Sequence, residues 1–330
     1  MKVSITGANG FIGSHLVDRL LAQGAEVTCL IRRTSNLRWL EKKKVRLVEG
    51  DLRSHDALKQ LIKDADYVYH IAGVVKSKTR EGYFSGNRDA TRNIFDICYR
   101  NNSRISKFIY ISSQAAVGPS YDLEHPVEES SACHPITTYG ESKLAAEEVV
   151  LGYRDRVPVT IVRPPAVYGP RDTEIFIFFE TIRRGLNPMI GFDEKRVSLI
   201  HARDLVDGII LAGESKQSAG EIYFISSETF YGWQECARLA ARLMGKNRPF
   251  QIRIPHALVY TIAGVAQFIS LFQKQAATLN IEKARDITQR YWTCSVKKAM
   301  HDLGYRQNIS LEQGFEETIK WYVDQGWIKR

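Results

Sequence analysis

The segment MKVSITGANGFIG, residues 1–13, decides the fold. Its first half is a short apolar run that predicts a buried strand, and the glycines Gly7, Gly10 and Gly13 follow. In a dinucleotide-binding turn the first glycine lets the chain turn sharply, the second lets a ligand approach the backbone, and the third lets a helix pack closely on the strand. The middle glycine stands one place later than in the commonest form of this motif, so the spacing alone also fits an ordinary tight turn.

The residues after the turn predict a helix over 11–23, which stops at Gly24. The free amide groups and the positive dipole end of this helix would face the glycines, and such an arrangement binds a pyrophosphate. The run 26–31 predicts the second strand of the unit. The order of strand, glycine turn, helix and strand therefore favours a dinucleotide site over an ordinary turn.

Strand and helix patterns keep alternating through the first half of the chain. They predict strands at 45–48, 66–72, 106–113 and 157–162, and helices at 54–63, 83–101 and 138–153. This alternation predicts an α/β protein with a doubly wound parallel sheet, the Rossmann fold, covered by helices on both faces. Ligands of such sheets collect at the carboxyl ends of the strands.

The chain has 330 residues, which is more than one hydrophobic core usually fills. We expect a Rossmann dinucleotide-binding domain over 1–167, to which a segment near 197–212 returns. We expect a smaller, interleaved substrate-binding domain over 168–330.

The formal net charge of +9 and the clusters Arg32–Arg33 and Lys42–Lys44 would suit an acidic ligand, an anionic membrane surface or a nucleic acid. A solvated basic face is the favoured interpretation of the lysines. The sequence contains no zinc-finger spacing, no aromatic RNA-binding motif and no basic heptad region. We therefore predict no nucleic-acid partner.

The five cysteines are scattered and include no Cys-x-x-Cys pair, which favours reduced thiols and argues against a metal site. The first residues lack the pattern of a secretory signal peptide. Both observations predict a cytoplasmic protein.

Arg32 and Arg33 stand where an NAD enzyme usually carries an acidic residue for the ribose 2′-hydroxyl. Guanidinium groups favour the additional 2′-phosphate of NADP, because a charged bidentate contact is strong. NADP is the predicted cofactor, and NAD is also possible. The alternative interpretation is that Arg32 only stacks on adenine, so that the site does not select between NADP and NAD.

Tyr139 and Lys143 lie four residues apart within a predicted helix, so both project from one face, one turn apart. A nearby ammonium would lower the pKa of a phenol, ordinarily about 10, and make it a usable acid or base. The spacing alone also fits a surface Tyr/Lys pair, but the glycine turn and the serine-ended strand 106–113 favour a catalytic pair.

The glycine turn, the pair Ser112–Ser113 and the run Tyr139-Gly-Glu-Ser-Lys143 together resemble the extended short-chain dehydrogenase/reductase family, and the resemblance spans nearly the whole chain. It implies that Ser113 holds the substrate oxygen, that Tyr139 transfers the proton, and that Lys143 tunes Tyr139 and holds the nicotinamide ribose. Ser113 is preferred to Ser112 because the run 112–118 then matches the family's serine-serine-x-x-x-x-glycine form. The resemblance also implies a homodimer formed through the helices at 83–101 and 138–153.

Other residues are predicted to contact the adenine, the central part of the dinucleotide or the nicotinamide. Asp51 could accept from the adenine amino group or could cap the following helix, and Leu52 could cover the ring. The full predicted set is Gly7, Asn9, Gly10, Phe11, Ile12, Gly13, Arg32, Arg33, Asp51, Leu52, Ala72, Gly73, Asn87, Tyr139, Lys143, Pro164 and Val167.

The second half of the chain predicts less about its ligand. Segment 197–210 resembles the strand and helix that return to the main sheet in this family, with Asp204 as helix cap. Val197 stands where sugar-nucleotide enzymes often carry an arginine for the diphosphate. Segment 256–272 is almost uncharged, and a buried or pocket-lining helix is favoured over a membrane contact or a hydrophobic substrate mouth.

These observations predict an oxidoreductase that transfers hydride between NAD(P) and an alcohol or ketone carbon, similar to the dihydroflavonol-reductase and 3β-hydroxysteroid-dehydrogenase branches. The alternative is a sugar-nucleotide epimerase or dehydratase with a tightly bound cofactor. A cofactor-sensing regulator on the same fold is a third interpretation.

Overall fold

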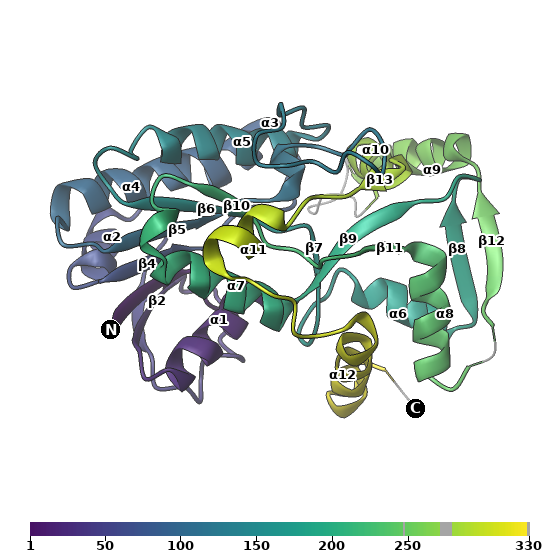
Figure 1. The fold of residues 1–330 in the computed structure, drawn as a ribbon, viewed down its shortest axis with the longest axis horizontal. Helices are drawn as coiled ribbons and strands as arrows, with labels where there is room; N and C mark the ends of the chain where they lie inside the picture. The colour runs from purple at the N-terminus through teal and green to yellow at the C-terminus, as the bar shows by residue number, and fades with distance from the viewer. Residues whose placement is uncertain (247, 271–278, 329–330) are drawn as a thin grey trace.

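A parallel sheet of seven strands forms the centre of the molecule, with the strand order β10-β6-β5-β4-β1-β2-β3 (Figure 1). The computed structural model describes residues 1–246, 248–270 and 279–328. The strands are β1 (Lys2–Thr6), β2 (Glu26–Ile31), β3 (Arg46–Glu49), β4 (Tyr67–His70), β5 (Lys107–Ile111), β6 (Val159–Arg163) and β10 (Ile222–Phe224). Because they are parallel, their carboxyl ends meet at one edge of the sheet.

Helices cover both faces of this sheet, as a doubly wound fold requires. One face carries α1 (Phe11–Ala22), α7 (Ala202–Glu214) and α11 (Lys297–Leu303), and the other carries α2 (His55–Ile62), α4 (Ala90–Asn101) and α5 (Thr138–Leu151). Figure 1 shows α4 and α5 on the opposite side of the sheet from α1 and α7. Apolar residues of both helix layers are fully buried against the strands. The predicted Rossmann fold is confirmed.

The helix predicted over 83–101 is interrupted. The chain forms α3 (Arg80–Phe84), a π-helical turn η1 (Ser85–Asp89) and then α4. Asn87 lies in the π turn and is hydrogen-bonded to both the amide and the carbonyl of Val74. The widened turn brings this polar side chain to the edge of the sheet, a placement that hydrophobic periodicity does not reveal.

The second half of the chain builds smaller sheets at the other end of the molecule. β9 (Arg196–His201) pairs with β7 (Ala166–Tyr168), β11 (Phe230–Gly232) and β13 (Tyr291–Trp292), and β8 (Leu186–Ile190) pairs with β12 (Phe250–Ile254). An aromatic core that includes Phe179, Phe315 and Tyr322 joins α6 (Phe176–Arg183), α8 (Trp233–Leu243) and α12 (Leu311–Asp324). The remaining helices are α9 (His256–Ser270) and α10 (Ile281–Thr288).

Two expectations about the returning segment are corrected. The helix α7 packs on the main sheet as expected, but β9 joins the second sheet, and β10 is the strand that returns. His201, and not Asp204, caps α7 with its ring nitrogen. The Asp204 carboxylate instead accepts from the amides of Asn308 and Ile309, which ties α7 to the chain before α12.

Candidate active site

The glycine turn has the geometry that the sequence predicts. Gly7 adopts a φ of +74°, and a Cβ atom there would lie 2.7 Å from the Ala72 amide nitrogen. A Cβ atom on Gly13 would lie 2.1 Å from the Gly7 carbonyl oxygen, so α1 packs directly on the turn. These close approaches of main chain to main chain exclude any side chain at both positions.

The N-terminus of α1 fits the pyrophosphate of a dinucleotide. Gly10 is its N-cap residue, no side chain caps it, and its first turn contains no acidic residue. A Cβ atom on Gly10 would meet only the Gly7 carbonyl, at 3.3 Å, so the turn is open beside it. The uncapped amide groups and the helix dipole therefore point where a phosphate would bind.

The groups predicted to bind the adenosine half lie next to this turn. Arg32 and Arg33 follow β2, both are exposed, and neither has an ion-pair partner among the residues that the structure describes. The Arg53 amide and the Ser54 hydroxyl hydrogen-bond to Asp51 and hold its pKa below its usual range. Ser54 takes the N-cap position of α2, so Asp51 is not the cap.

Four further members of the predicted cofactor set are only partly exposed. Asn9 donates to the Asn36 carbonyl at 3.4 Å, and the Phe11 ring packs edge-on against His15. Ile12 packs against the apolar core between α1 and the main sheet. Leu52 packs against the core on the other face of the sheet, which includes α2.

Tyr139 and Ser113 are brought together although 26 residues separate them in the sequence. Their side chains are close enough for the Ser113 hydroxyl to lower the pKa of the Tyr139 phenol in part. Ser113 directly follows β5, and Tyr139 lies in the first turn of α5. Ser112, in contrast, is buried, and its hydroxyl has no partner among the described residues. The geometry thus distinguishes the two serines and supports Ser113 as the partner of the phenol.

Lys143 is buried on the same helix face as Tyr139 and points toward the end of β5. Its ammonium nitrogen donates to the Ile111 carbonyl at 2.7 Å and lies 4.4 Å from the centre of the Tyr110 ring. Burial lowers the pKa of Lys143 to about 7, and the nearby Glu147 carboxylate opposes part of that shift.

The prediction that Lys143 lowers the pKa of Tyr139 is wrong. Burial raises the pKa of Tyr139 to about 12, the hydrogen bond with Ser113 lowers it in part, and the Tyr83 phenol raises it again. Lys143 contributes no resolved effect, because its ammonium is directed at the main chain of β5. Tyr139 is therefore protonated at neutral pH.

The middle of the predicted cofactor site is built from small residues and one amide. A Cβ atom on Gly73 would lie 3.0 Å from the Asn87 side-chain oxygen and 3.8 Å from the Lys143 ammonium. The Asn87 side chain also donates to the Ser142 hydroxyl at 2.8 Å. Ala72, Gly73, Asn87 and Lys143 thus meet at one place, beside the glycine turn.

The residues predicted to contact the nicotinamide follow β6. The Pro164 carbonyl accepts from the Gln114 amide at 2.9 Å, which ties this segment to the turn after Ser113. Val167 lies in β7 opposite Ile200 of β9. Both residues therefore lie at the junction of the main sheet and the second sheet.

Sequence reasoning missed a buried ion pair behind the site. The Arg163 guanidinium donates to both Glu147 carboxylate oxygens, at 2.9 and 2.6 Å, and both side chains are almost completely buried. This ion pair holds α5 against β6. Glu147 lies four residues after Lys143, so helical spacing places it on the same face of α5, and this signal could have revealed it.

A second missed contact holds the start of α5. Glu282 of α10 accepts from the Thr138 amide at 2.9 Å and from the Thr138 hydroxyl. It thereby fixes the residue before Tyr139 from the other half of the molecule. No local pattern pairs positions 144 residues apart, so this contact could not be read from the sequence.

The fold and this site define a class: a Rossmann enzyme with a dinucleotide turn and a Ser/Tyr/Lys group at the carboxyl edge of its sheet. The NAD dependent epimerase/dehydratase family matches residues 3–235, and the chain belongs to this family. Its curated relatives and structural neighbours include dehydrogenases, epimerases and dehydratases, and the chain is an enzyme of this kind.

Two curated relatives match nearly the whole chain. Ceramide reductase from Caulobacter vibrioides is 31% identical over 329 residues, covering 99% of this chain and 96% of the relative. Sterol-4-alpha-carboxylate 3-dehydrogenase (decarboxylating) from Homo sapiens is 27% identical over 335 residues, covering 97% and 87%.

Solved structures share the fold. UDP-glucuronic acid 4-epimerase from Bacillus cereus, in complex with NAD, has a TM-score of 0.78 at 23% identity and covers 99% of this chain and 98% of its own. The dTDP-glucose 4,6-dehydratase from Streptomyces venezuelae, with NAD bound, has a TM-score of 0.80 at 22% identity, covering 100% and 99%.

Proposed function

We propose that this protein is an NADP-dependent oxidoreductase that interconverts a secondary alcohol and a ketone on a hydrophobic substrate of the ceramide or sterol kind. The observation that carries the proposal is the grouping of Ser113 and Tyr139 at the end of β5, with Lys143 one helical turn away and the glycine turn beside them. A nicotinamide, when bound, supplies the hydride acceptor or donor.

In the direction of reduction, Tyr139 donates its hydroxyl proton to the substrate oxygen while the carbon gains hydride. Ser113 hydrogen-bonds the same oxygen and stabilises the charge that develops on it. The raised pKa of Tyr139, about 12, keeps the phenol protonated at neutral pH, as a proton donor requires. Lys143 and Asn87 would hold the ribose side of the cofactor next to them.

The cofactor preference rests on Arg32 and Arg33. Both guanidinium groups are exposed next to the end of β2 and are not engaged in ion pairs with the described residues. Both guanidinium groups are therefore available to a 2′-phosphate. Asp51, the acidic residue in the predicted cofactor set, already accepts hydrogen bonds from Arg53 and Ser54 of its own turn.

The substrate class rests on the relatives and on the second sheet. Val197 is buried in the aromatic core, and the neighbouring Arg196 and Arg203 are paired with Glu194 and Glu317. A sugar diphosphate would therefore find no free arginine at these three positions. The names of the two curated relatives, a ceramide reductase and a sterol dehydrogenase, favour a lipid alcohol or ketone instead.

The test uses purified protein with NADPH or NADH and three substrates: a ceramide ketone, a 3-ketosterol and UDP-glucuronic acid. We expect oxidation of added NADPH with a lipid ketone, and a cofactor that exchanges freely. Epimerisation of the sugar nucleotide without net consumption of cofactor, together with tightly bound NAD, would establish the epimerase alternative. Inertness toward all three would favour a regulator.

We further propose that the chain works as a cytoplasmic homodimer through α4 and α5. All five cysteines are free thiols and four of them are buried, which suits a reducing compartment. Tyr99 of α4 is exposed and offers an apolar contact on this side. Light scattering of the purified protein tests the dimer, and a monomeric mass would refute it.

A further inference from the structure

Helix α9 carries an apolar stripe on its outer side. Leu258, Ile262, Val265 and Ile269 follow the spacing i, i+4, i+7, i+11, which places them on one face of a helix. Each of these side chains is 47% to 55% exposed. The opposite face, with Val259 and Ala263, is buried against Ala284 of α10. The helix is therefore already anchored on one side and is hydrophobic on the other.

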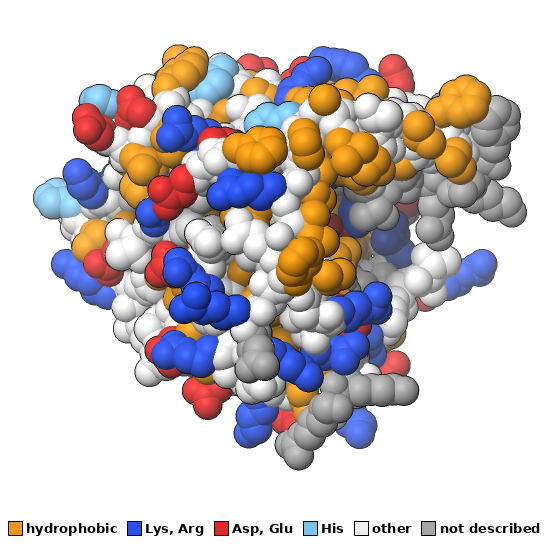
Figure 2. Space-filling model, turned by 90° about the vertical axis from the view of Figure 1, so that its right-hand side faces the viewer, with side chains coloured by type: hydrophobic (Ala, Val, Ile, Leu, Met, Phe, Trp, Pro, Cys, Tyr) orange, Lys and Arg blue, Asp and Glu red, His pale blue; other side chains and the backbone are white. Residues whose placement is uncertain are grey.

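No charged residue lies between Pro255 and Ser270, so nothing on α9 itself makes this stripe polar. One exposed aromatic residue lies at the end of β8 that adjoins the start of α9, where Phe192 is 70% exposed. Figure 2 shows hydrophobic side chains gathered on the upper part of this end of the molecule, with Lys and Arg side chains beside them. Contiguous apolar surface of this kind marks an interaction site.

Basic residues outnumber acidic ones in the segments that contain α9 and α10. Of the six Asp, Glu, Lys and Arg residues in 250–270 and 279–290, four are basic. Arg253, Arg285 and Arg290 are exposed and have no carboxylate partner within the described parts of the chain. The Arg253 guanidinium lies 5.9 Å from the centre of the Phe192 ring, so this cation lies directly beside exposed apolar surface.

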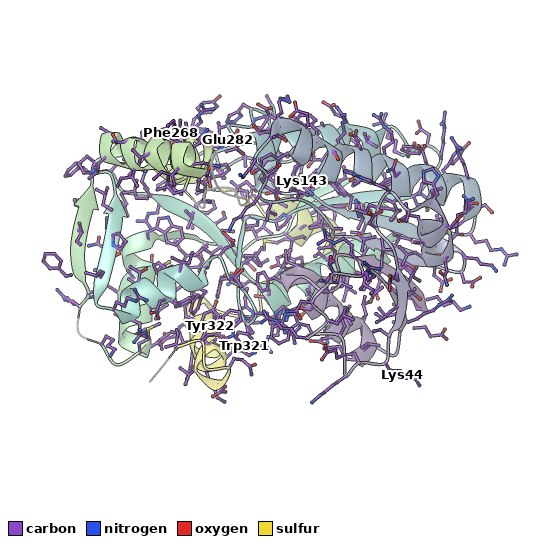
Figure 3. The ribbon with its side chains drawn as sticks, turned by 180° about the vertical axis from the view of Figure 1, so that it is seen from behind. Lys44, Lys143, Phe268, Glu282, Trp321 and Tyr322 are labelled. Atoms are coloured by element: carbon purple, nitrogen blue, oxygen red, sulfur yellow. The ribbon has the colours of Figure 1, made fainter. Side chains whose placement is uncertain are left out.

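Helix α9 is connected to the candidate active site through α10. α9 packs on α10, and Glu282 of α10 holds Thr138, the residue before Tyr139. Figure 3 shows Lys143, Glu282 and Phe268 in this order along one side of the molecule, from the main sheet toward α9. A surface that binds α9 would therefore be separated by one helix, α10, from the start of α5, which carries Tyr139.

We propose that α9 is a docking helix that lies flat on an anionic lipid bilayer, with Leu258, Ile262, Val265 and Ile269 in the acyl boundary and Arg253, Arg285 and Arg290 at the headgroups. An amphipathic contact of this type combines buried apolar area with attraction to anionic lipid. Within the described residues no helix is long and apolar enough to cross a membrane, so the contact is on the surface. Delivery of a lipid substrate from the bilayer to Tyr139 is the part that rests on the proposed function.

The experiment is sedimentation of the full chain with vesicles made of equal parts phosphatidylglycerol and phosphatidylcholine, or of phosphatidylcholine alone. The test variant is the double substitution Ile262→Glu and Val265→Glu. The matched control is Leu47→Glu, a change at a 42% exposed position on β3 at the edge of the main sheet. Circular dichroism melting confirms that both variants fold.

We expect the wild type and Leu47→Glu to bind the anionic vesicles, and the double variant to bind at least about tenfold more weakly because carboxylates would enter the acyl boundary. Binding to phosphatidylcholine alone, and binding at high salt, should be weaker because the guanidinium groups lose their counterpart. Substitution of Arg253, Arg285 and Arg290 by Gln should remove that difference between the two lipid compositions.

Absence of wild-type binding to either vesicle, or equal loss in Leu47→Glu and the double variant, would overturn the docking surface. So would a dimer in light scattering that the double variant dissociates without any vesicle binding, since the stripe would then bind a second copy. Turnover of a water-soluble ketone without vesicles separates the two proposals. Vesicle binding without any turnover would leave the docking helix intact and refute the oxidoreductase, and turnover without vesicle binding would do the reverse.

Discussion

Helices α1 and α9 both contain a glycine, and the two glycines have opposite surroundings. A Cβ atom on Gly13 of α1 would lie 2.1 Å from the Gly7 carbonyl oxygen, whereas a Cβ atom on Gly264 of α9 would meet nothing within 4 Å. At Gly13, main chain packs on main chain and leaves no room for one methyl group. On the outer side of α9, exposed side chains make the surface, and there is space to change them.

The contrast between the closely packed glycine turn and the open surface of α9 indicates how one fold can serve several chemistries. The glycine turn and Lys143 are set by close backbone packing and buried contacts, so changes there are costly. The outer surface of α9 is set by side chains that touch little else in the described chain. A family can therefore keep the hydride chemistry and vary the substrate.

The largest effect is expected for Tyr139→Phe. Removal of the phenol hydroxyl near Ser113 should reduce kcat about 10³-fold, because the proposed proton donor to the substrate oxygen is lost. Affinity for NADPH should stay within about twofold, since the ring and the turn remain. Steady-state turnover and cofactor titration by fluorescence measure the two quantities. Retention of turnover would show that Tyr139 is not the proton donor.

Gly13→Ala should weaken NADPH binding about a hundredfold, because the added methyl group must displace the Gly7 carbonyl and α1 with it. The measurement is cofactor titration, together with thermal melting to confirm that the variant folds. Normal affinity would mean that the close contact between α1 and the turn is not needed for the site.

Lys143→Met separates activity from stability. Turnover should be lost, while the free energy of unfolding at pH 7 should rise by about 1–3 kcal/mol, because a buried ammonium is replaced by an apolar chain. The folded-state pKa of about 7 lies below the ordinary value of 10.5, so the unfolded chain binds more protons between these pH values. The wild type should therefore gain stability relative to the variant as pH rises from 7 toward 10.

Urea unfolding at several pH values checks this prediction, with Lys107→Met as a control for a second buried lysine that lies away from the site. A constant stability difference between wild type and Lys143→Met across this pH range would contradict the assigned burial of the charge.

Arg32→Ala should raise the KM for NADPH about tenfold and leave that for NADH nearly unchanged, because one charged hydrogen bond to the 2′-phosphate is lost. Lys42→Ala, a change within the other basic cluster, is the matched control. Equal effects on both cofactors would mean that Arg32 stacks on adenine and does not select the phosphate.

The smallest effect is expected for Gly264→Ala, the counterpart of Gly13→Ala. Open space surrounds this position in the middle of α9, so alanine should stabilise the helix by about 0.5–1 kcal/mol. Chemical denaturation measures the change, with cofactor affinity as the unaffected control. Destabilisation would show that the outer face of α9 is packed more closely than its exposure indicates.

Much of the site follows from local sequence. The three glycines predicted the turn because their tasks depend on a few adjacent residues, and the four-residue spacing of Tyr139 and Lys143 fixed their shared face because helical geometry is local. The influence of Ser113 on the pKa of Tyr139, and the burial of Ser112, agree with the choice of Ser113 over Ser112.

Other features depend on contacts that no local pattern encodes. Asn87 in the π turn is held by hydrogen bonds to Val74. Helix α5 is held in position by Arg163 and by Glu282. Strand β9 pairs outside the main sheet. The spacing of Tyr139 and Lys143 likewise predicted the wrong direction for the phenol's pKa, because the spacing does not report burial.

By itself the sequence determined that this is a Rossmann enzyme of the epimerase/dehydratase family with Tyr139 and Lys143 on one helix face, since these features arise from spacings of a few residues. Only the tertiary structure decided which serine meets the phenol, where the lysine points and which side of α9 faces outward. The physical reason is that burial and hydrogen bonding between distant segments set these properties, and both exist only once the chain has folded.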